Sequence, residues 1–368
     1  MPKRPIPEVL LKSDGLVSVL VVLLGFAIAS ILVVVTGRSP GGMYSALLQV
    51  VSGLDARRGV WNIRYVGEWL VISMPLILCG FSMAFASRTG LFNIGAEGQY
   101  VAGITAAQIV ALYGPRIPVI HVLLAVTAAM AAGGLCGALV GYLKARYSVS
   151  EVVATIMMNY IVLYLHRWIC LGLPGSTTYK TPDFPETARL SSSLMEAATN
   201  GSHLNYGIFL TIGAIFFFWI IMGRTRLGYS LRATGYNKEA ARCAGINVNR
   251  SITTAMGIAG AFAGLAGVIV ALGSLTYGRI MAGQDGYGFD GIAVALVGNN
   301  TAWGTAVAGL LFGMLKSAQP LMQTRQIPKE IVSIIIGLVV VFISLRGGVR
   351  MMVEWRMKDG TGKGETAE

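Results

Sequence analysis

Long apolar runs separated by short polar connections dominate the 368-residue chain. The first run, residues 16–35, is uninterrupted and long enough to cross about 30 Å of hydrocarbon. Nine further runs follow at residues 66–86, 96–113, 118–143, 152–173, 206–222, 252–273, 289–298, 305–321 and 331–345. The eighth of the ten is short for a full crossing, which leaves the count open by one. The pattern predicts an all-α fold, a polytopic membrane bundle of about ten transmembrane helices.

Composition supports a membrane protein and excludes an ordinary soluble fold. Hydrophobic residues make up 54% of the chain and charged residues only 12%. The net charge of +12 comes from basic residues grouped in a few hydrophilic stretches, as in cytoplasmic loops, so it does not indicate nucleic-acid binding. The four cysteines and three histidines share no metal-ligand spacing. We therefore expect no metal site and no nucleic-acid partner, and we expect contact with membrane lipid.

The basic stretches also predict the orientation. With the N-terminus inside and an even number of crossings, residues 144–146, 224–250 and 346–358 all lie on the cytoplasmic side. Both termini are then cytoplasmic. The predicted domains are an N-terminal cytoplasmic segment (1–15), a transmembrane domain (16–346) with a cytoplasmic loop (224–251), and a cytoplasmic tail (347–368).

One stretch, residues 90–103, places Asn93, Glu97 and Gln99 at the start of an apolar run. A carboxylate inside a membrane costs roughly 2.5 to 3.5 kcal/mol unless it has a partner or a wet cavity. Asn93 and Glu97 are four residues apart and share one helical face. Glu97 either lines a solute pathway or caps the first turn of its own helix at the cytoplasmic surface. Asn159, halfway along the fifth run, is a weaker pathway candidate.

Short matching patterns indicate an internal repeat. Phe-Asn-x-x-Ala at residues 92–96 resembles Phe-Asp-x-x-Ala at 289–293, and Glu-Val-Val at 151–153 resembles Glu-Ile-Val at 330–332. The members of each pair lie five runs apart. An odd offset inverts one copy relative to the other, as in many transporters. The inverted repeat would bring Asp290 to the same central pathway as the first polar stretch.

The loop at residues 224–251 carries six basic residues and one acid. Asn237 can cap a short helix over residues 238–242, and Gly245 can end it. A capped basic helix beside the membrane is typical of a docking surface for a soluble partner. Plain positive-inside charge is the alternative, but charge alone needs neither the cap nor the glycine.

Four segments together resemble a known family. They are GLFNIGAEGQ (90–99), SEVVATIMMNYI (150–161), RATGYNKEAARCAGI (232–246) and GYGFDGIAVALVGN (286–299). They resemble permease subunits of bacterial ATP-binding-cassette (ABC) importers, in the nucleoside branch that depends on basic membrane proteins. The same family includes ribose and branched-chain amino acid permeases. The resemblance covers about residues 16–346.

The resemblance implies a permease subunit in the bacterial inner membrane that forms the path for a small polar solute, with nucleosides as the leading candidate. It implies a second permease in a heterodimer, two ATPase subunits that bind ATP and Mg²⁺, and an extracytoplasmic solute-binding protein. The chain itself would need no cofactor. The implied ATPase-coupling residues are Arg232, Gly235, Asn237, Lys238, Glu239, Ala240, Ala241 and Gly245. The Ile-x-Leu-Pro continuation of the coupling pattern is absent, so the detailed contacts are not carried over.

Catalytic motifs are not supported by their context. The GxGxxG at residues 286–291 follows no strand, and the glycine-rich segment at residues 360–364 lacks the first glycine of a phosphate loop. We therefore predict a transport subunit and not an enzyme. A secondary transporter or facilitator for small polar solutes is the alternative, which a co-purifying ATPase would exclude. The predicted pathway residues are Asn93, Glu97, Gln99, Asn159 and Asp290.

Overall fold

The computed structural model describes residues 14–55, 59–328 and 330–344. Within them the α-helices are α2 (Asp14–Val35), α3 (Pro40–Ser52), α4 (Arg64–Arg88), α5 (Ala96–Tyr113), α6 (Ile120–Tyr147), α7 (Glu151–Leu171), α8 (Ser193–Ala198), α9 (Gly207–Arg224), α10 (Arg226–Tyr236), α11 (Lys238–Cys243), α12 (Val248–Gly273), α13 (Tyr287–Val297), α14 (Ala302–Thr324) and α15 (Glu330–Ser344). One 3-10 helix, η1, covers Glu186–Ala188. Strands β1 (Leu54–Asp55) and β2 (Val60–Trp61) pair antiparallel, as do β3 (Lys180–Asp183) and β4 (Tyr277–Arg279).

Each of the ten apolar runs contains one of these helices, so the predicted helical fold is confirmed. In the described part of the chain, five helices are long and apolar enough to cross a membrane: α4, α6, α7, α9 and α12. Helix α13, in the eighth run, has only 11 residues. At 1.5 Å per residue that length covers roughly half of a 30 Å hydrocarbon layer.

The chain divides into two compact units. The smaller unit takes the described residues up to Met43 and from Met322 onward, and in it α2 packs on α15. The Arg325 guanidinium donates a hydrogen bond from Nη1 to the Gly42 carbonyl at 2.6 Å. The larger unit, Tyr44–Leu321, contains all the features described below.

Helix α12 forms the centre of the larger unit, packed on α4, α5 and α6. Glycines allow this approach, because a methyl group at Gly264 would lie 2.2 Å from the Ala129 carbonyl oxygen, and one at Gly267 would lie 2.4 Å from that of Tyr100. Small residues drive helix association in lipid, where backbones must come close to gain van der Waals contact.

Helix α4 repeats this arrangement with α13 and α14. A methyl group at Gly291 of α13 would lie 2.7 Å from the Cys79 backbone, and one at Gly309 of α14 would lie 2.4 Å from the Ile77 side chain. Helix α4 therefore packs closely on α13 and α14, in the same way that α12 packs closely on α5 and α6. This reciprocal packing has the five-run offset of the predicted inverted repeat. The sequence patterns themselves are not in register, since Phe92 precedes α5 whereas Phe289 lies in the first turn of α13.

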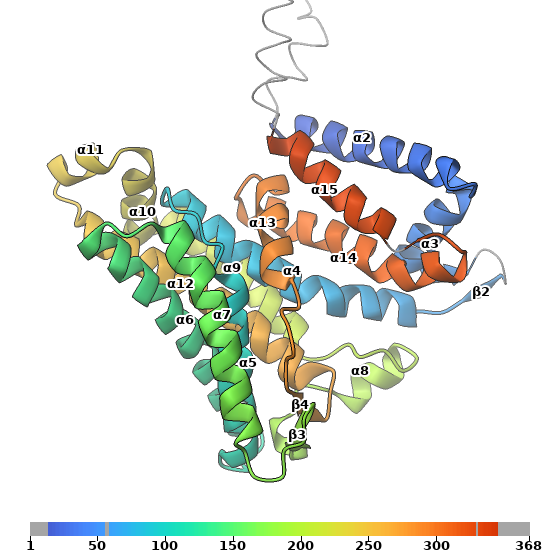
Figure 1. Cartoon of the computed structure of the whole chain (residues 1–368), viewed down its shortest axis with the longest axis horizontal. Helices are drawn as coiled ribbons and strands as arrows, with labels where there is room; N and C mark the ends of the chain where they lie inside the picture. The colour runs from blue at the N-terminus through green and yellow to red at the C-terminus, as the bar shows by residue number, and fades with distance from the viewer. Residues whose placement is uncertain (1–13, 56–58, 329, 345–368) are drawn as a thin grey trace, which may run out of the picture. The chain divides into compact units, whose positions relative to one another are not determined.

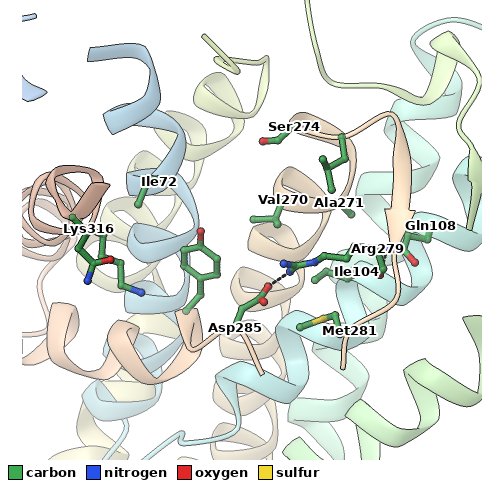
Figure 2. Close-up of a pocket in the computed structure, with 13 residues that line it drawn as sticks. Ile72, Ile104, Gln108, Val270, Ala271, Ser274, Arg279, Met281, Asp285 and Lys316 are labelled. Atoms are coloured by element: carbon green, nitrogen blue, oxygen red, sulfur yellow. Dashed lines mark hydrogen bonds and ion pairs between the residues drawn. The ribbon is translucent and has the colours of Figure 1, made fainter. Parts of the chain in front are cut away.

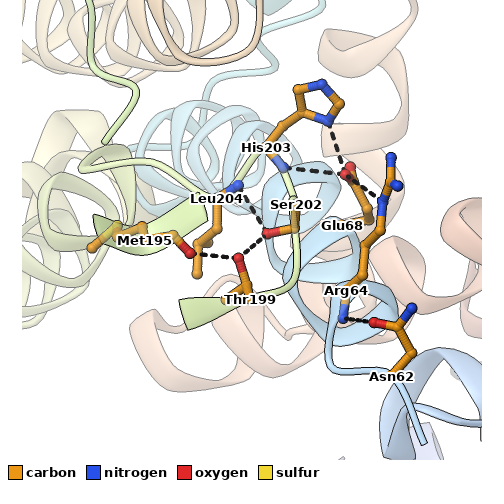
Figure 3. Close-up of polar contacts among 8 residues, drawn as sticks. All are labelled: Asn62, Arg64, Glu68, Met195, Thr199, Ser202, His203 and Leu204. Atoms are coloured by element: carbon orange, nitrogen blue, oxygen red, sulfur yellow. Dashed lines mark hydrogen bonds and ion pairs between the residues drawn. The ribbon is translucent and has the colours of Figure 1, made fainter. Parts of the chain in front are cut away.

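The two polar ends of the larger unit are distinct. Figure 1 shows α10 and α11 at one end and the β3–β4 pair at the other, with α7 running between them. At the β3–β4 end, the connection before α9 is tied to the start of α4 (Figure 3). The His203 backbone N–H donates to Glu68 Oε1 at 3.1 Å, and its Nδ1 lies 2.8 Å from the same oxygen. The Thr199 and Ser202 hydroxyls are hydrogen-bonded to each other nearby.

Candidate functional site: a polar pocket and a contact to the cytoplasmic loop

A pocket of about 500 Å³ lies in the larger unit among α4, α5, α12, α13, α14 and the connection that follows β4 (Figure 2). Its polar lining consists of Gln108, Ser274, Arg279, Asp285, Lys316 and Gln319, together with the phenol of Tyr287. Isoleucine, valine and methionine side chains fill the rest of the wall. A concave site with a few polar groups on an apolar background is typical of small-molecule sites.

The charges in the pocket wall are paired. Arg279 forms an ion pair with Asp285, which also accepts a 2.9 Å hydrogen bond from the Tyr100 hydroxyl. Lys316 forms an ion pair with Asp290, and its ammonium group lies 5.2 Å from the centre of the Tyr287 ring. Each cation is thereby neutralised by one carboxylate. The pocket presents hydrogen-bonding groups and an aromatic ring without a net charge, a combination suited to a neutral polar solute.

The connection that carries Arg279 and Asp285 is held by α5 and α7. Gln108 donates from Nε2 to the Arg279 carbonyl at 3.2 Å, and the Met281 N–H donates to His166 Nε2 at 3.2 Å. Because Nε2 accepts, the neutral imidazole carries its proton on Nδ1, which lies 2.8 Å from the Thr105 hydroxyl. His166 therefore positions the backbone beside the pocket.

Glu97 caps a helix other than its own. Its carboxylate accepts the N–H groups of Gly286 at 2.8 Å and Gly288 at 2.6 Å, the first donors of α13. Glu97 is 0% exposed, so it does not lie at an open cytoplasmic surface. Four N–H groups at a helix start lack partners within the helix, and a carboxylate there also meets the positive end of the dipole. The carboxylate has the partner that an intramembrane acid requires.

The glycines of the GxGxxG pattern make this contact possible. Gly286 has a φ of +85°, a backbone conformation that residues other than glycine adopt only with strain. A methyl group at Gly288 would lie 2.2 Å from the Glu97 backbone nitrogen. Backbone geometry at a helix start, and not a dinucleotide, accounts for the motif.

The start of α5 is capped in a similar way. Asn159 of α7 accepts the Gly98 N–H at 2.7 Å through Oδ1 and donates from Nδ2 to the Ile94 carbonyl at 3.1 Å. Asn93 donates to Gln99 Oε1 at 2.9 Å and to the Ser82 hydroxyl at 2.9 Å. Asn93, Gln99 and Asn159 are at most 1% exposed.

The predicted pathway residues are thus brought together around the starts of α5 and α13, and Asp290 forms an ion pair with Lys316 of the pocket wall. Their role in the pathway stays a prediction. The sequence analysis missed Arg279, Asp285, Tyr287 and Lys316. Lys316 carried a usable signal, because an ionisable residue inside an apolar run marks a functional position by default.

The helix predicted within the loop at residues 224–251 is confirmed as α11. Asn237 Oδ1 accepts the N–H groups of Glu239 and Ala240 at 3.0 Å each, which caps α11. Gly245, with φ +79°, follows the end of α11. Glu239 forms an ion pair with Arg242 at 3.0 Å, and Ala241 is the buried residue of this short helix.

Helix α10 contacts the segment between α4 and α5. A methyl group at Gly235 would lie 2.4 Å from the Arg88 carbonyl oxygen, and one at Gly90 would lie 3.2 Å from the Gly235 Cα. Arg88, in the last turn of α4, donates from Nε to the Asn300 carbonyl at 2.8 Å, just beyond the end of α13. The loop is therefore in backbone contact with the chain that leads to Glu97.

Helices able to span a membrane, a buried carboxylate at the start of α5 that caps α13, and a neutral polar pocket beside them are typical of a polytopic transport protein. The family described as "Branched-chain amino acid transport system / permease component" matches residues 65–344, and the chain belongs to this family. It is a multi-pass membrane permease component of an ABC transporter. The predicted family and the predicted membrane bundle are confirmed.

Three relatives place the chain within the family. It is 41% identical to the guanosine ABC transporter permease protein NupP of Bacillus subtilis, over 95% of this chain and 98% of the relative. It is 34% identical to the nucleoside ABC transporter permease protein NupB of Lactococcus lactis, over 92% of this chain and 93% of the relative. A second permease of B. subtilis, the guanosine ABC transporter permease protein NupQ, is 28% identical over 67% of this chain and 79% of the relative.

Proposed function

We propose that this permease belongs to an importer of nucleosides and that the solute passes through the pocket beside α13. The neutral lining of the pocket carries the proposal, because Tyr287 offers a ring for a nucleobase and the amides of Gln108 and Gln319 offer partners for sugar hydroxyls. The relatives at 41% and 34% identity are permeases for guanosine and for nucleosides, which supports the same substrate class.

The proposed transporter contains further subunits. ATP and Mg²⁺ would bind to separate ATPase subunits that dock on α10 and α11, and a second permease would complete a heterodimer. An extracytoplasmic solute-binding protein would deliver the solute at the β3–β4 end. The Asn237 cap and the exposed charges of Glu239 and Arg242 support docking at the loop, because they hold a short charged helix at the surface. A secondary transporter would purify without an ATPase.

The proposed orientation in the inner membrane predicts a labelling pattern. Glu186 on η1, which follows β3, and Tyr236, the last residue of α10, are both exposed, and Figure 1 shows β3 and α10 at opposite ends of the larger unit. In otherwise cysteine-free protein, Glu186→Cys should react with an impermeant maleimide from the outside, and Tyr236→Cys only after the cells are opened. The reverse pattern would place the loop outside and refute the proposed topology and ATPase docking.

Asp285→Asn should lower nucleoside uptake, because it leaves Arg279 without its carboxylate and gives the pocket a net positive charge. Arg279 is about half exposed, so we expect a loss of about fivefold, which corresponds to roughly 1 kcal/mol. Uptake into proteoliposomes that contain the complete transporter, measured with radiolabelled guanosine, checks this.

A double variant distinguishes the effect of the net charge in the pocket from the effect of the altered side-chain shape. Arg279→Gln combined with Asp285→Asn restores neutrality and should recover most of the uptake, a coupling that a double-mutant cycle measures. Asp183→Asn on β3 is the matched control, since Asp183 is exposed and does not line the pocket. If Asp285→Asn took up guanosine at the wild-type rate, the proposal that the solute passes through this pocket would be refuted.

A further inference from the structure

Two small cavities beside α10 share two arginines. One has a volume of about 160 Å³ and the other about 170 Å³, and Arg88 and Arg232 line both. Arg88 comes from the last turn of α4 and Arg232 from the middle of α10. Neither cavity has an acidic residue in its lining. Both cavities are therefore lined by two cationic residues and by no carboxylate.

The arginines are incompletely satisfied. Arg88 donates to the carbonyl oxygens of Asn300 at 2.8 Å and of Asn299 at 3.5 Å. The Arg232 residue is half-buried and, within the described part of the chain, its side chain makes no hydrogen bond or ion pair. Two cations that share a partly desolvated space repel each other, and an anion with several acceptor oxygens removes that cost. A phosphate group fits this requirement because guanidinium groups bind it through paired N–H donors.

The cavity of about 160 Å³ has apolar residues on the side away from the arginines. Phe218, Trp219 and Met222 line this cavity, and all three lie near the end of α9, a helix long and apolar enough to cross the membrane. The Arg224 guanidinium lies 5.0 Å from the centre of the Trp219 ring. Aromatic and basic residues at the end of a span mark the level of the lipid headgroups. A carboxylate from a soluble subunit would use only the basic side.

We propose that Arg88 and Arg232 bind the phosphate of an anionic phospholipid whose acyl chain lies along Trp219, which is 40% exposed, while Phe218 and Met222 are buried behind it. Basic pockets between membrane helices are known to hold anionic headgroups. The lipid would connect α4, α9 and α10 at the place where α10 meets the α4–α5 segment. This site is separate from the solute pocket and does not depend on which solute is carried.

Trp219 supplies the measurement. The complete transporter is placed in nanodiscs in which either phosphatidylglycerol or phosphatidylcholine carries brominated acyl chains, which quench nearby tryptophans. Subtracting the signal of Trp219→Phe isolates the quenching of Trp219. We expect brominated phosphatidylglycerol to quench Trp219 at about fivefold lower mole fraction than phosphatidylcholine, the preference that one additional basic contact gives. This comparison uses the wild-type side chains at both arginines, so it stands even if an arginine variant fails to fold.

Charge variants then locate the headgroup. Arg232→Gln should bring the two lipids to parity, whereas Arg232→Lys should keep part of the preference. Arg226→Gln is the matched control, because Arg226 begins the same helix, is exposed and lines neither cavity. It should leave the preference unchanged.

Three results would overturn the proposal. Equal quenching by both lipids in the wild-type protein would exclude a headgroup preference. Loss of the preference on addition of inorganic phosphate, with no loss in equimolar sodium chloride, would assign the arginines to a free anion. A preference that is absent from the complete transporter and appears only after the ATPase subunits are removed would assign the arginines to a carboxylate of that partner.

Discussion

Glu97→Leu is expected to abolish uptake and to lower the apparent melting temperature of the purified transporter. The variant removes the acceptor of two buried N–H groups at the start of α13. Each buried donor without a partner costs about 1 to 3 kcal/mol, so the variant loses about 2 to 6 kcal/mol at a junction that also positions Tyr287 and Asp285. Uptake by proteoliposomes and the melting temperature followed by tryptophan fluorescence would measure the two effects.

Glu97→Gln should have a smaller effect on both quantities. Its amide keeps one acceptor oxygen, so one of the two N–H groups retains a partner and the other meets an NH₂ group. Glu196→Leu on α8 is the control, because Glu196 is exposed and lies outside the membrane helices. A Glu97→Leu protein that melts and transports like the wild type would mean that the cap on α13 carries neither stability nor function.

The helices were predictable because their signals are local. An apolar run of about 20 residues specifies a membrane helix whatever surrounds it, and the run at residues 96–113 coincides with α5. The cap of α11 was also predictable, since Asn237 and the N–H groups that it accepts are at most three residues apart. Both signals, the length of an apolar run and the cap of a helix, depend only on residues that are close together in the sequence.

The role of Glu97 was not predictable in the same way. The sequence identified the residue by the cost of an intramembrane carboxylate, but its partners lie 189 and 191 residues later in the chain. The two sequence interpretations, a pathway group and a cap on its own helix, both omitted a cap on a second helix. The inverted repeat was the available clue, because it brings two helix starts together at the middle of the bundle.

The pocket depends on tertiary packing even more strongly. Arg279 ends β4 and Asp285 lies in the short connection between β4 and α13, where charged residues ordinarily indicate a solvated loop. Hydrogen bonds from α5 and α7 hold this segment against the helices beside the pocket. Lys316 could have been selected as an ionisable group in an apolar run, but its pairing with Asp290 requires that α13 and α14 be placed side by side.

Gly235→Val is expected to uncouple ATP hydrolysis from uptake, on the proposal that ATPase subunits dock on α10 and α11. The first side-chain carbon would lie 2.4 Å from the Arg88 carbonyl oxygen and 3.0 Å from the Gly90 nitrogen, and both are backbone atoms that cannot move aside alone. Helix α10 must then separate from the α4–α5 segment. Motion of the loop would no longer reach the chain that leads to Glu97, and Arg88 would lose its fixed position against Asn300.

The measurement compares ATP hydrolysis and guanosine uptake in the same proteoliposomes, with the amount of assembled complex as reference. For Gly235→Val we expect hydrolysis to persist at a rate within about threefold of the wild type, while uptake falls at least tenfold, a change of about 1.4 kcal/mol or more in effective coupling. Gly223→Val on α9 is the control, since no atom lies within 4 Å of the added carbon.

A second loop variant distinguishes contact from docking. Glu239→Lys reverses a charge on the exposed side of α11 and removes the pair with Arg242 without changing the contact to α4. It should weaken ATPase binding, so hydrolysis and uptake fall together, whereas in Gly235→Val they separate. If both variants lowered hydrolysis and uptake in proportion, or if Gly235→Val transported normally, the close contact between α10 and the α4–α5 segment would have no part in transmitting ATPase motion.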